Sequence, residues 1–231
     1  MQVRHLWATP VAQDIVVLPD EIRRQLINVL QRKEAEREKI SEASPEFHRF
    51  MTSKKFYAST HYNIFAEAAE HPERDAILAF ESISIGLFRR YLADAYQIPE
   101  DEVVEVSGRC FGNVQTPGGR TFPHYHQSSD VVLVHYLDVG HGTDLQANLT
   151  PRHGAHALLL LDPRGSPNFP WWQKVESIIP KQGLTIIHPA YLWHETNVWR
   201  GAGTRVCIVV NFQIIKPGYL DLHRPLQISA I

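Results

Sequence analysis

The chain has 231 residues, 44% of them hydrophobic and 21% charged, with a formal net charge of −2, which is ordinary for a globular protein. It contains no basic run of the kind that binds nucleic acid. No apolar run approaches the length of a membrane span, and the first residues lack a signal-peptide pattern. The two cysteines, Cys110 and Cys207, lie far apart and argue against a disulfide scaffold. We therefore expect a cytoplasmic protein with no membrane or nucleic-acid partner.

Helical patterns dominate residues 1–102, which we expect to form a helical layer packed on the rest of the chain. The segment Leu18-Pro19-Asp20-Glu21 is typical of a helix start, and apolar residues follow it at helical spacing. The highly charged run over residues 32–44 is predicted to be the solvated end of this helix and a loop. A second helix is predicted over residues 71–95, where a broad apolar face recurs.

Short β-rich runs separated by glycine and proline dominate the chain from residue 103 onward. Candidate strands cover residues 103–115, 128–139, 156–162, 183–189 and 204–215. Several short strands at this spacing favour an antiparallel sandwich or a jelly roll. The predicted fold class is mainly β with N-terminal helices (α+β), with residues 103–231 as the core and residues 1–102 as part of the same integrated domain.

Histidine is the outlier of the composition, because eight of the thirteen histidines lie between His124 and His194. In the segment Pro123-His124-Tyr125-His126, an extended strand would turn both histidines to one face, where they could reach the same metal ion. A third ligand is needed from elsewhere, and His194 is the best candidate because it follows an apolar run. The first pair alone is a weak signal, since ordinary strand histidines give the same pattern. The pair together with a distant histidine at a strand end is stronger evidence for a metal site.

Arg205 follows His194 by eleven residues, across a segment with Gly201 and Gly203 that predicts a hairpin turn. Arg205 should therefore open the strand that pairs with the one bearing His194. By strand parity, residues 205, 207, 209 and 211 should share one face, and residues 206, 208, 210 and 212 the other. An arginine turned into an apolar barrel needs an anion, and a carboxylate matches its planar guanidinium. The alternative is a surface arginine at a strand start.

The order of these motifs resembles the 2-oxoglutarate/Fe(II) oxygenase superfamily. The likeness rests on residues 113–118, 122–126, 162–164 and 191–194 and on the return strand with Arg205. Within the superfamily, the pattern is most similar to a family of small oxygenases with PHxH, WLxH and a later arginine. The resemblance implies a double-stranded β-helix (jelly-roll, cupin-like) catalytic core, with His124 and His194 as iron ligands and Arg205 as the 2-oxoglutarate anchor. It also implies that Asn113 and Gln115 line the cosubstrate.

One position departs from the superfamily pattern. Most members carry a carboxylate two residues after the first histidine, in a two-histidine, one-carboxylate triad with open iron positions. This chain has His126 there, and three neutral imidazoles leave an Fe(II) site one charge unit more positive. His126 is the preferred third ligand. Asp130 is an alternative if the chain bulges after His126, and a triad with a missing ligand is another.

The sequence thus predicts a dioxygenase that uses Fe(II), 2-oxoglutarate and O₂ to hydroxylate, or otherwise oxidise, a small-molecule substrate such as an amino acid or a derivative. Desaturation and demethylation are alternative outcomes. Two other classes stay open: a cupin-type three-histidine dioxygenase that uses no 2-oxoglutarate, and a non-catalytic metal-binding β-barrel. The oligomeric state is also open, with a homodimer as one option.

Overall fold

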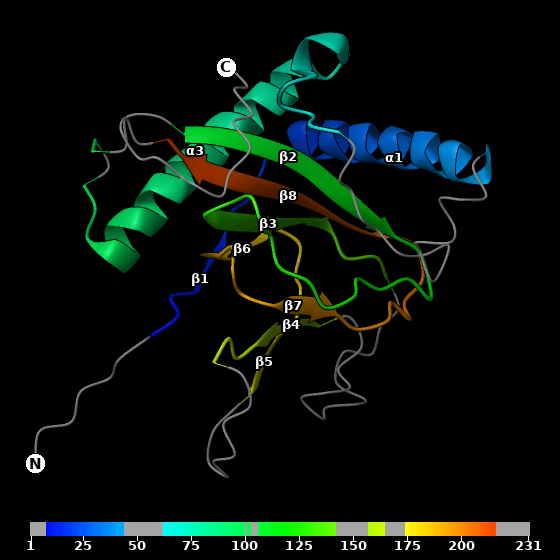
Figure 1. Cartoon of the computed structure of the whole chain (residues 1–231). Helices are drawn as coiled ribbons and strands as arrows, with labels where there is room; N and C mark the ends of the chain where they lie inside the picture. The colour runs from blue at the N-terminus through cyan, green and yellow to red at the C-terminus, as the bar shows by residue number, and fades with distance from the viewer. Residues whose placement is uncertain are drawn as a thin grey trace, which may run out of the picture.

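The computed structural model describes residues 8–43, 62–99, 101–102, 106–141, 157–164 and 174–215. The larger of two antiparallel sheets contains β1 (Ala12–Ile15), β2 (Val106–Gln115), β3 (Val131–Asp138), β6 (Leu184–Pro189) and β8 (Arg205–Ile214). The smaller sheet contains β4 (Leu158–Leu161), β5 (Val175–Ile178) and β7 (His194–Thr196). The strand orders are β1-β6-β3-β8-β2 and β5-β4-β7, and Figure 1 shows the small sheet below the large one.

Two long helices, α1 (Asp20–Ala43) and α3 (Arg74–Tyr96), lie on the side of the large sheet away from the small sheet (Figure 1). A short 3-10 helix, η1 (Ala68–Glu70), precedes α3. Helix α1 begins at the predicted Asp20, where an acidic first turn suits the positive end of the helix dipole. Neither helix is long and apolar enough to cross a membrane, and this holds for every helix in the described part of the chain.

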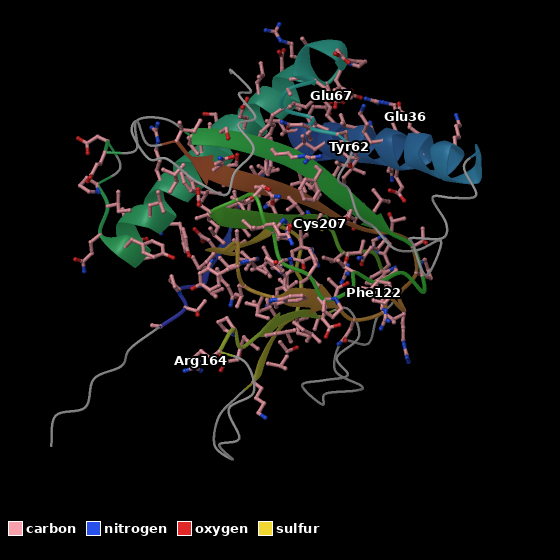
Figure 2. All side chains as sticks on the ribbon, viewed as in Figure 1. Glu36, Tyr62, Glu67, Phe122, Arg164 and Cys207 are labelled. Carbon is pink, nitrogen blue, oxygen red and sulfur yellow. The ribbon has the colours of Figure 1, made fainter. Side chains whose placement is uncertain are left out.

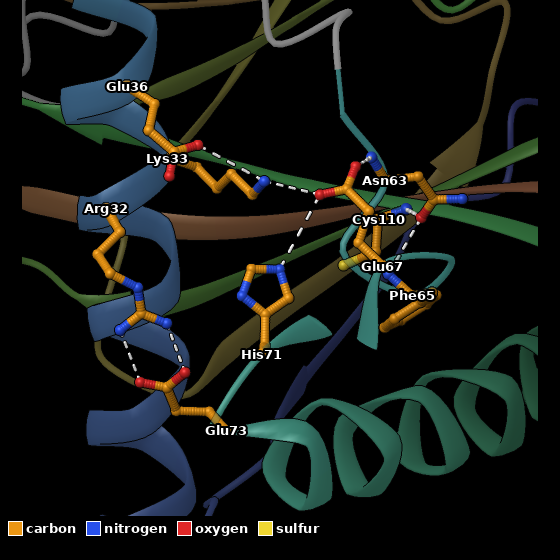
Figure 3. A network of polar contacts seen from close by, with 9 residues as sticks. All are labelled: Arg32, Lys33, Glu36, Asn63, Phe65, Glu67, His71, Glu73 and Cys110. Carbon is orange, nitrogen blue, oxygen red and sulfur yellow. Dashed lines mark hydrogen bonds and ion pairs between the residues drawn. The ribbon is translucent and has the colours of Figure 1, made fainter. Parts of the chain in front are cut away.

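The charged run after residue 31 was predicted to hold the end of this helix and a loop, and the loop is wrong for residues 32–43, because α1 continues to Ala43. Its charges find distant partners, as Figure 3 shows. Arg32 binds the carboxylate of Glu73 through both guanidinium nitrogens, and Lys33 Nζ lies 2.7 Å from Glu67 Oε2. Arg32 and Glu73 are 41 residues apart in sequence, so local patterns do not indicate the pairing. The ion pairs attach α1 to the segment that leads into α3.

Two hydrophobic cores lie on opposite faces of the large sheet. The first packs residues of α1 and α3, such as Leu30 and Phe88, against Val206, Ile208 and Phe212 of β8. The second lies between the two sheets and contains apolar residues from both, among them Phe111, Val132, Val134, Tyr136, Leu158, Leu160, Ile178, Leu184, Ile186, Cys207 and Val209. The predicted alternation along β8 is confirmed, because its even-numbered residues face the helices and its odd-numbered residues face the small sheet.

Each of the five predicted strands has a counterpart in the structure, whereas β1, β5 and β7 were not predicted as strands. The prediction that Arg205 opens a strand is confirmed, but its predicted hairpin with the His194 strand is wrong. Strand β7 pairs with β4, whereas β8 pairs with β2 and β3. The segment between His194 and Arg205 therefore crosses from one sheet to the other. Gly203 (φ 79°) has a left-handed backbone in this crossing, which glycine adopts without steric cost.

Candidate metal centre

His124, His126 and His194 come together beside β7. One nitrogen from each ring lies within 4.8 Å of the others, and the Nε2 atoms of His126 and His194 are 3.3 Å apart. His124 forms an isolated antiparallel β-bridge with His194. Its backbone N–H donates to the His194 carbonyl at 3.0 Å, and the reverse bond is 2.9 Å long. This bridge brings two distant segments together, so that three imidazoles could hold one metal ion.

Backbone carbonyls determine which nitrogen is available on two of these rings. The Nδ1 of His124 lies 2.8 Å from the Phe122 carbonyl oxygen, and that of His194 lies 2.9 Å from the Leu192 carbonyl oxygen. Because a carbonyl oxygen can only accept, Nδ1 carries the proton in each neutral ring and Nε2 keeps its lone pair. Metal-binding histidines are commonly oriented by a hydrogen bond of this kind.

Burial keeps the three imidazoles neutral. Desolvation lowers the pKa of His126 to about 3, and it also lowers the pKa values of His124 and His194. Electrostatic repulsion among the neighbouring imidazoles lowers the pKa values of His126 and His194 further. The neutral ring is the form that binds a metal, so no proton has to leave the site at neutral pH.

Asp130, the alternative third ligand, is directed elsewhere. Its Oδ2 accepts a hydrogen bond of 2.8 Å from the backbone N–H of Ile214, near the end of β8. Among the described residues, the group that could hold a metal consists of the three histidines and does not include this carboxylate. Asp130 thus stabilises the end of β8.

A pocket of about 430 Å³, which includes open space at its mouth, joins the three histidines to Arg205. Alternate residues of three neighbouring strands form one wall, and Figure 2 shows Cys207 between the two sheets. The lining residues from the large sheet are Phe111, Asn113, Gln115, Val134, Tyr136, Arg205, Cys207 and Val209. All six predicted site residues therefore lie around one pocket, although four of them come from segments far from His194 in sequence.

Arg205 is 2% exposed and forms the polar end of this pocket. Its guanidinium donates a hydrogen bond to Gln115 Oε1. The amide of Gln115 donates in turn to Thr121 Oγ1 at 2.8 Å and to Thr196 Oγ1 at 3.4 Å. Burial lowers the pKa of Arg205, but a guanidinium still keeps its charge. A buried, oriented guanidinium of this kind could bind a carboxylate.

Tyr136, Thr121 and Thr196 line the pocket but were not among the predicted site residues. Tyr136 is 1% exposed, and burial raises the pKa of its hydroxyl, which therefore stays a hydrogen-bond donor at neutral pH. It shares a face of β3 with Val134, so strand parity would have found it once one face was known to be the inner one. The two threonines lie in irregular or very short segments, where sequence patterns carry little signal.

Asp162 and Arg164, which contributed to the resemblance, lie outside the pocket. Arg164 Nε donates to Asp162 Oδ1 at 2.8 Å, and the two side chains form an ion pair. Figure 2 shows Arg164 on the far side of the small sheet from Cys207. The pair therefore contributes to the local turn and does not reach the three histidines.

A family model described as "Putative 2OG-Fe(II) oxygenase" matches residues 109–211, a range that contains all six predicted site residues. The match makes the core of this chain, residues 109–211, similar to the 2OG-Fe(II) oxygenase superfamily. Members of this superfamily use Fe(II), 2-oxoglutarate and O₂, and the match supports an oxidoreductase with these cofactors. Among curated proteins, none matches the chain significantly.

Solved structures of this superfamily share the fold at low identity. A prolyl-4-hydroxylase from Pseudomonas putida matches with a TM-score of 0.51 and 14% identity, over 89% of this chain and 88% of its own. A prolyl hydroxylase from Trichoplax adhaerens, in complex with a hypoxia inducible factor peptide fragment, matches with a TM-score of 0.52 and 11% identity, over 88% and 83%. AviO1 from Streptomyces viridochromogenes Tue57 matches at 0.50 and 15%, over 91% of both chains. These matches show the fold, and the predicted double-stranded β-helix core is confirmed.

Proposed function

We propose that this oxygenase binds Fe(II) through His124, His126 and His194, binds 2-oxoglutarate between that metal and Arg205, and hydroxylates a small molecule. The observation that carries the proposal is that three neutral imidazoles and a buried guanidinium line one pocket. When bound, the metal and the cosubstrate supply the chemistry that activates O₂. The residues of the chain bind, orient and shield these groups.

The three imidazoles fit a divalent iron. Imidazole is a suitable donor for Fe(II), and three protein ligands leave coordination positions for other molecules. Because none of the three carries a charge, the site keeps the full charge of the ion. A dianion such as 2-oxoglutarate is attracted more strongly to this site than to one with a carboxylate ligand. The departure from the superfamily triad is therefore compatible with the same cosubstrate.

The Arg205 end of the pocket fits the second carboxylate of 2-oxoglutarate. Gln115 receives a hydrogen bond from the guanidinium, while Thr121 and Thr196 hold the amide of Gln115. This chain of bonds orients the planar guanidinium before a ligand arrives, which lowers the entropy lost on binding. Tyr136 lines the same pocket as Arg205, and its protonated hydroxyl adds a donor for the same carboxylate. Asn113 lines the wall beside them.

The rest of the pocket favours a small substrate. Its volume of about 430 Å³ includes open space, and the cosubstrate would fill part of it. The apolar wall of Phe111, Val134, Leu158 and Val209 lies next to polar groups. An amino acid or a derivative, with a short apolar part and a polar part, matches this mixture, and hydroxylation is the outcome we propose.

Succinate formation tests the proposed function. Anaerobically purified protein is given Fe(II) and 2-oxoglutarate and is then exposed to O₂, with His194→Ala and Arg205→Ala alongside it. We expect slow succinate formation that both substitutions abolish. Arg164→Ala is the matched control, because Arg164 lies outside the pocket, and it should retain the wild-type rate. Iron binding without affinity for 2-oxoglutarate, or O₂ consumption without succinate, would contradict the proposal and favour a three-histidine dioxygenase of the cupin type.

A further inference from the structure

His188 of β6 is a fully buried histidine with an unused lone pair. Its side chain is 0% exposed, and its Nδ1 lies 2.9 Å from the carbonyl oxygen of Pro189. Since that oxygen can only accept, Nδ1 carries the proton and Nε2 is an acceptor. Within the described part of the chain, this Nε2 is buried and has no hydrogen-bond partner. A buried acceptor that has lost its water and gained no donor is unusual in a folded protein and calls for an explanation.

The location of His188 supplies that explanation. Its ring meets the ring of His194 edge-on, with the centroids 4.9 Å apart. The ring centroid of His194 lies 4.2 Å from that of His124 and 5.1 Å from that of His126, so His188 lies next to the candidate metal centre. It is not itself one of the group whose nitrogens lie within 4.8 Å of one another. His188 therefore stands beside the metal position.

His135 shows that burial alone does not leave a histidine without a partner. It is 2% exposed, and burial lowers its pKa to about 4, as it does for His188. However, His135 Nδ1 forms a 2.8 Å hydrogen bond with Thr185 Oγ1, and its ring packs against Phe80 on the helix side of the sheet. Of these two buried histidines of the large sheet, it is His188, next to the candidate metal centre, that has a buried ring nitrogen without a hydrogen-bond partner.

We propose that His188 is a positioning residue of the metal centre, whose Nε2 accepts a hydrogen bond from a water molecule bound to the metal. This inference rests on the proposed function, because the water needs the metal. A metal-bound water is a strong donor, since the ion draws electron density from its O–H bonds. In a triad with a carboxylate ligand, the second carboxylate oxygen can accept such a bond. His126 offers no comparable acceptor, and His188 provides one.

Cobalt(II) binding tests this inference without turnover. Cobalt(II) accepts the same donors, and its visible spectrum reports its ligands. His188→Phe keeps a planar ring of similar size but removes the lone pair, whereas His188→Gln keeps a carbonyl acceptor. We expect His188→Phe to weaken cobalt(II) binding by roughly 10-fold to 100-fold, the range found when partners that orient metal ligands are lost. Its spectrum should also change. His188→Gln should remain closer to the wild type in both measurements.

The controls separate this inference from the proposed function. His135→Phe makes the same substitution at an equally buried position and should leave the cobalt(II) affinity and spectrum unchanged. If the wild type binds cobalt(II) and His194→Ala does not, while His188→Phe matches the wild type, the role of His188 is overturned and the metal site stands. If the wild type fails to bind, both proposals fail. Should His188→Phe not fold, His188→Leu carries the same prediction.

Discussion

The two faces of the large sheet come from the same strands and have different roles. On β8, Val206, Ile208 and Phe212 pack under the helices, whereas Arg205 and Cys207 face the pocket. The helix-side face gains stability from apolar contacts. The pocket-side face carries polar groups whose burial costs free energy unless they find partners. We therefore expect that substitutions on the helix-side face change stability and that substitutions on the pocket-side face change ligand binding.

The largest effect on stability is expected from Phe212→Ala on the helix-side face. Phe212 is 0% exposed, and its ring stacks on Phe88 with the centroids 4.5 Å apart. Loss of this ring should lower the free energy of unfolding by about 3–5 kcal/mol, as measured by urea denaturation. The 2-oxoglutarate affinity of the folded fraction should not change. A folded Phe212→Ala protein that has lost this affinity would show that the two faces are coupled.

Arg205→Met, on the pocket-side face, should lower the affinity for 2-oxoglutarate without lowering stability. We expect it to weaken 2-oxoglutarate binding by about 100-fold, because it removes the charge partner of a buried carboxylate. The free energy of unfolding should stay the same or rise, since a buried charge is replaced by an apolar chain of similar length. Calorimetric titration and urea denaturation measure the two quantities. Arg205→Lys keeps the charge but loses the planar guanidinium that binds a carboxylate through two hydrogen bonds. Its affinity for 2-oxoglutarate should lie between those of the wild type and Arg205→Met.

Gly112→Ala tests how closely α1 packs on β2. A Cβ atom at this position would lie 2.5 Å from Leu30 Cδ1 and 2.8 Å from the carbonyl oxygen of Cys207. Overpacking of this kind should lower the free energy of unfolding by about 1–3 kcal/mol. Gly108→Ala on the same strand is the control, because the nearest atom to its Cβ would be 3.5 Å away. Equal stability of the two variants would contradict the described packing.

A pH titration of stability gives the smallest expected effect. Burial lowers the pKa of His135 to about 4, while an unfolded histidine has a pKa of about 6.5. Below pH 6.5 the unfolded chain therefore binds a proton that the folded chain does not, so stability falls as the pH drops toward 4. Each such histidine contributes about 1.4 kcal/mol per pH unit in this window. His135→Phe should make the slope shallower by this amount; an unchanged slope would mean that His135 is already protonated when folded.

Much of the fold could be predicted because the relevant signals are local. Alternating or continuous apolar runs located β2, β3, β4, β6 and β8, and an acidic start located α1. The six site residues could be named from motif order and from the parity of the strand that Arg205 opens. Their gathering around one pocket follows from the pairing of β8 with β2, which sets Asn113 opposite Cys207 and Gln115 opposite Arg205.

The rest depends on contacts between distant segments. The length of α1 depends on the partners of Arg32 and Lys33 some forty residues away, and short strands such as β7 are defined by pairing more than by composition. The wrong hairpin between His194 and Arg205 has the same origin. A glycine-rich segment indicates a change of direction, but it does not say whether the next strand joins the same sheet or the facing one.

In the proposed function, the three histidines and Arg205 form one site for a metal and 2-oxoglutarate. Calorimetric titration of 2-oxoglutarate into the anaerobic protein, with and without Fe(II), tests it most directly, together with His194→Ala and Arg205→Met. We predict one binding event in the Fe(II)-loaded wild type, weak or absent binding without metal, and loss of affinity in both variants. Tight binding that persists without metal, or that neither substitution weakens, would contradict the claim.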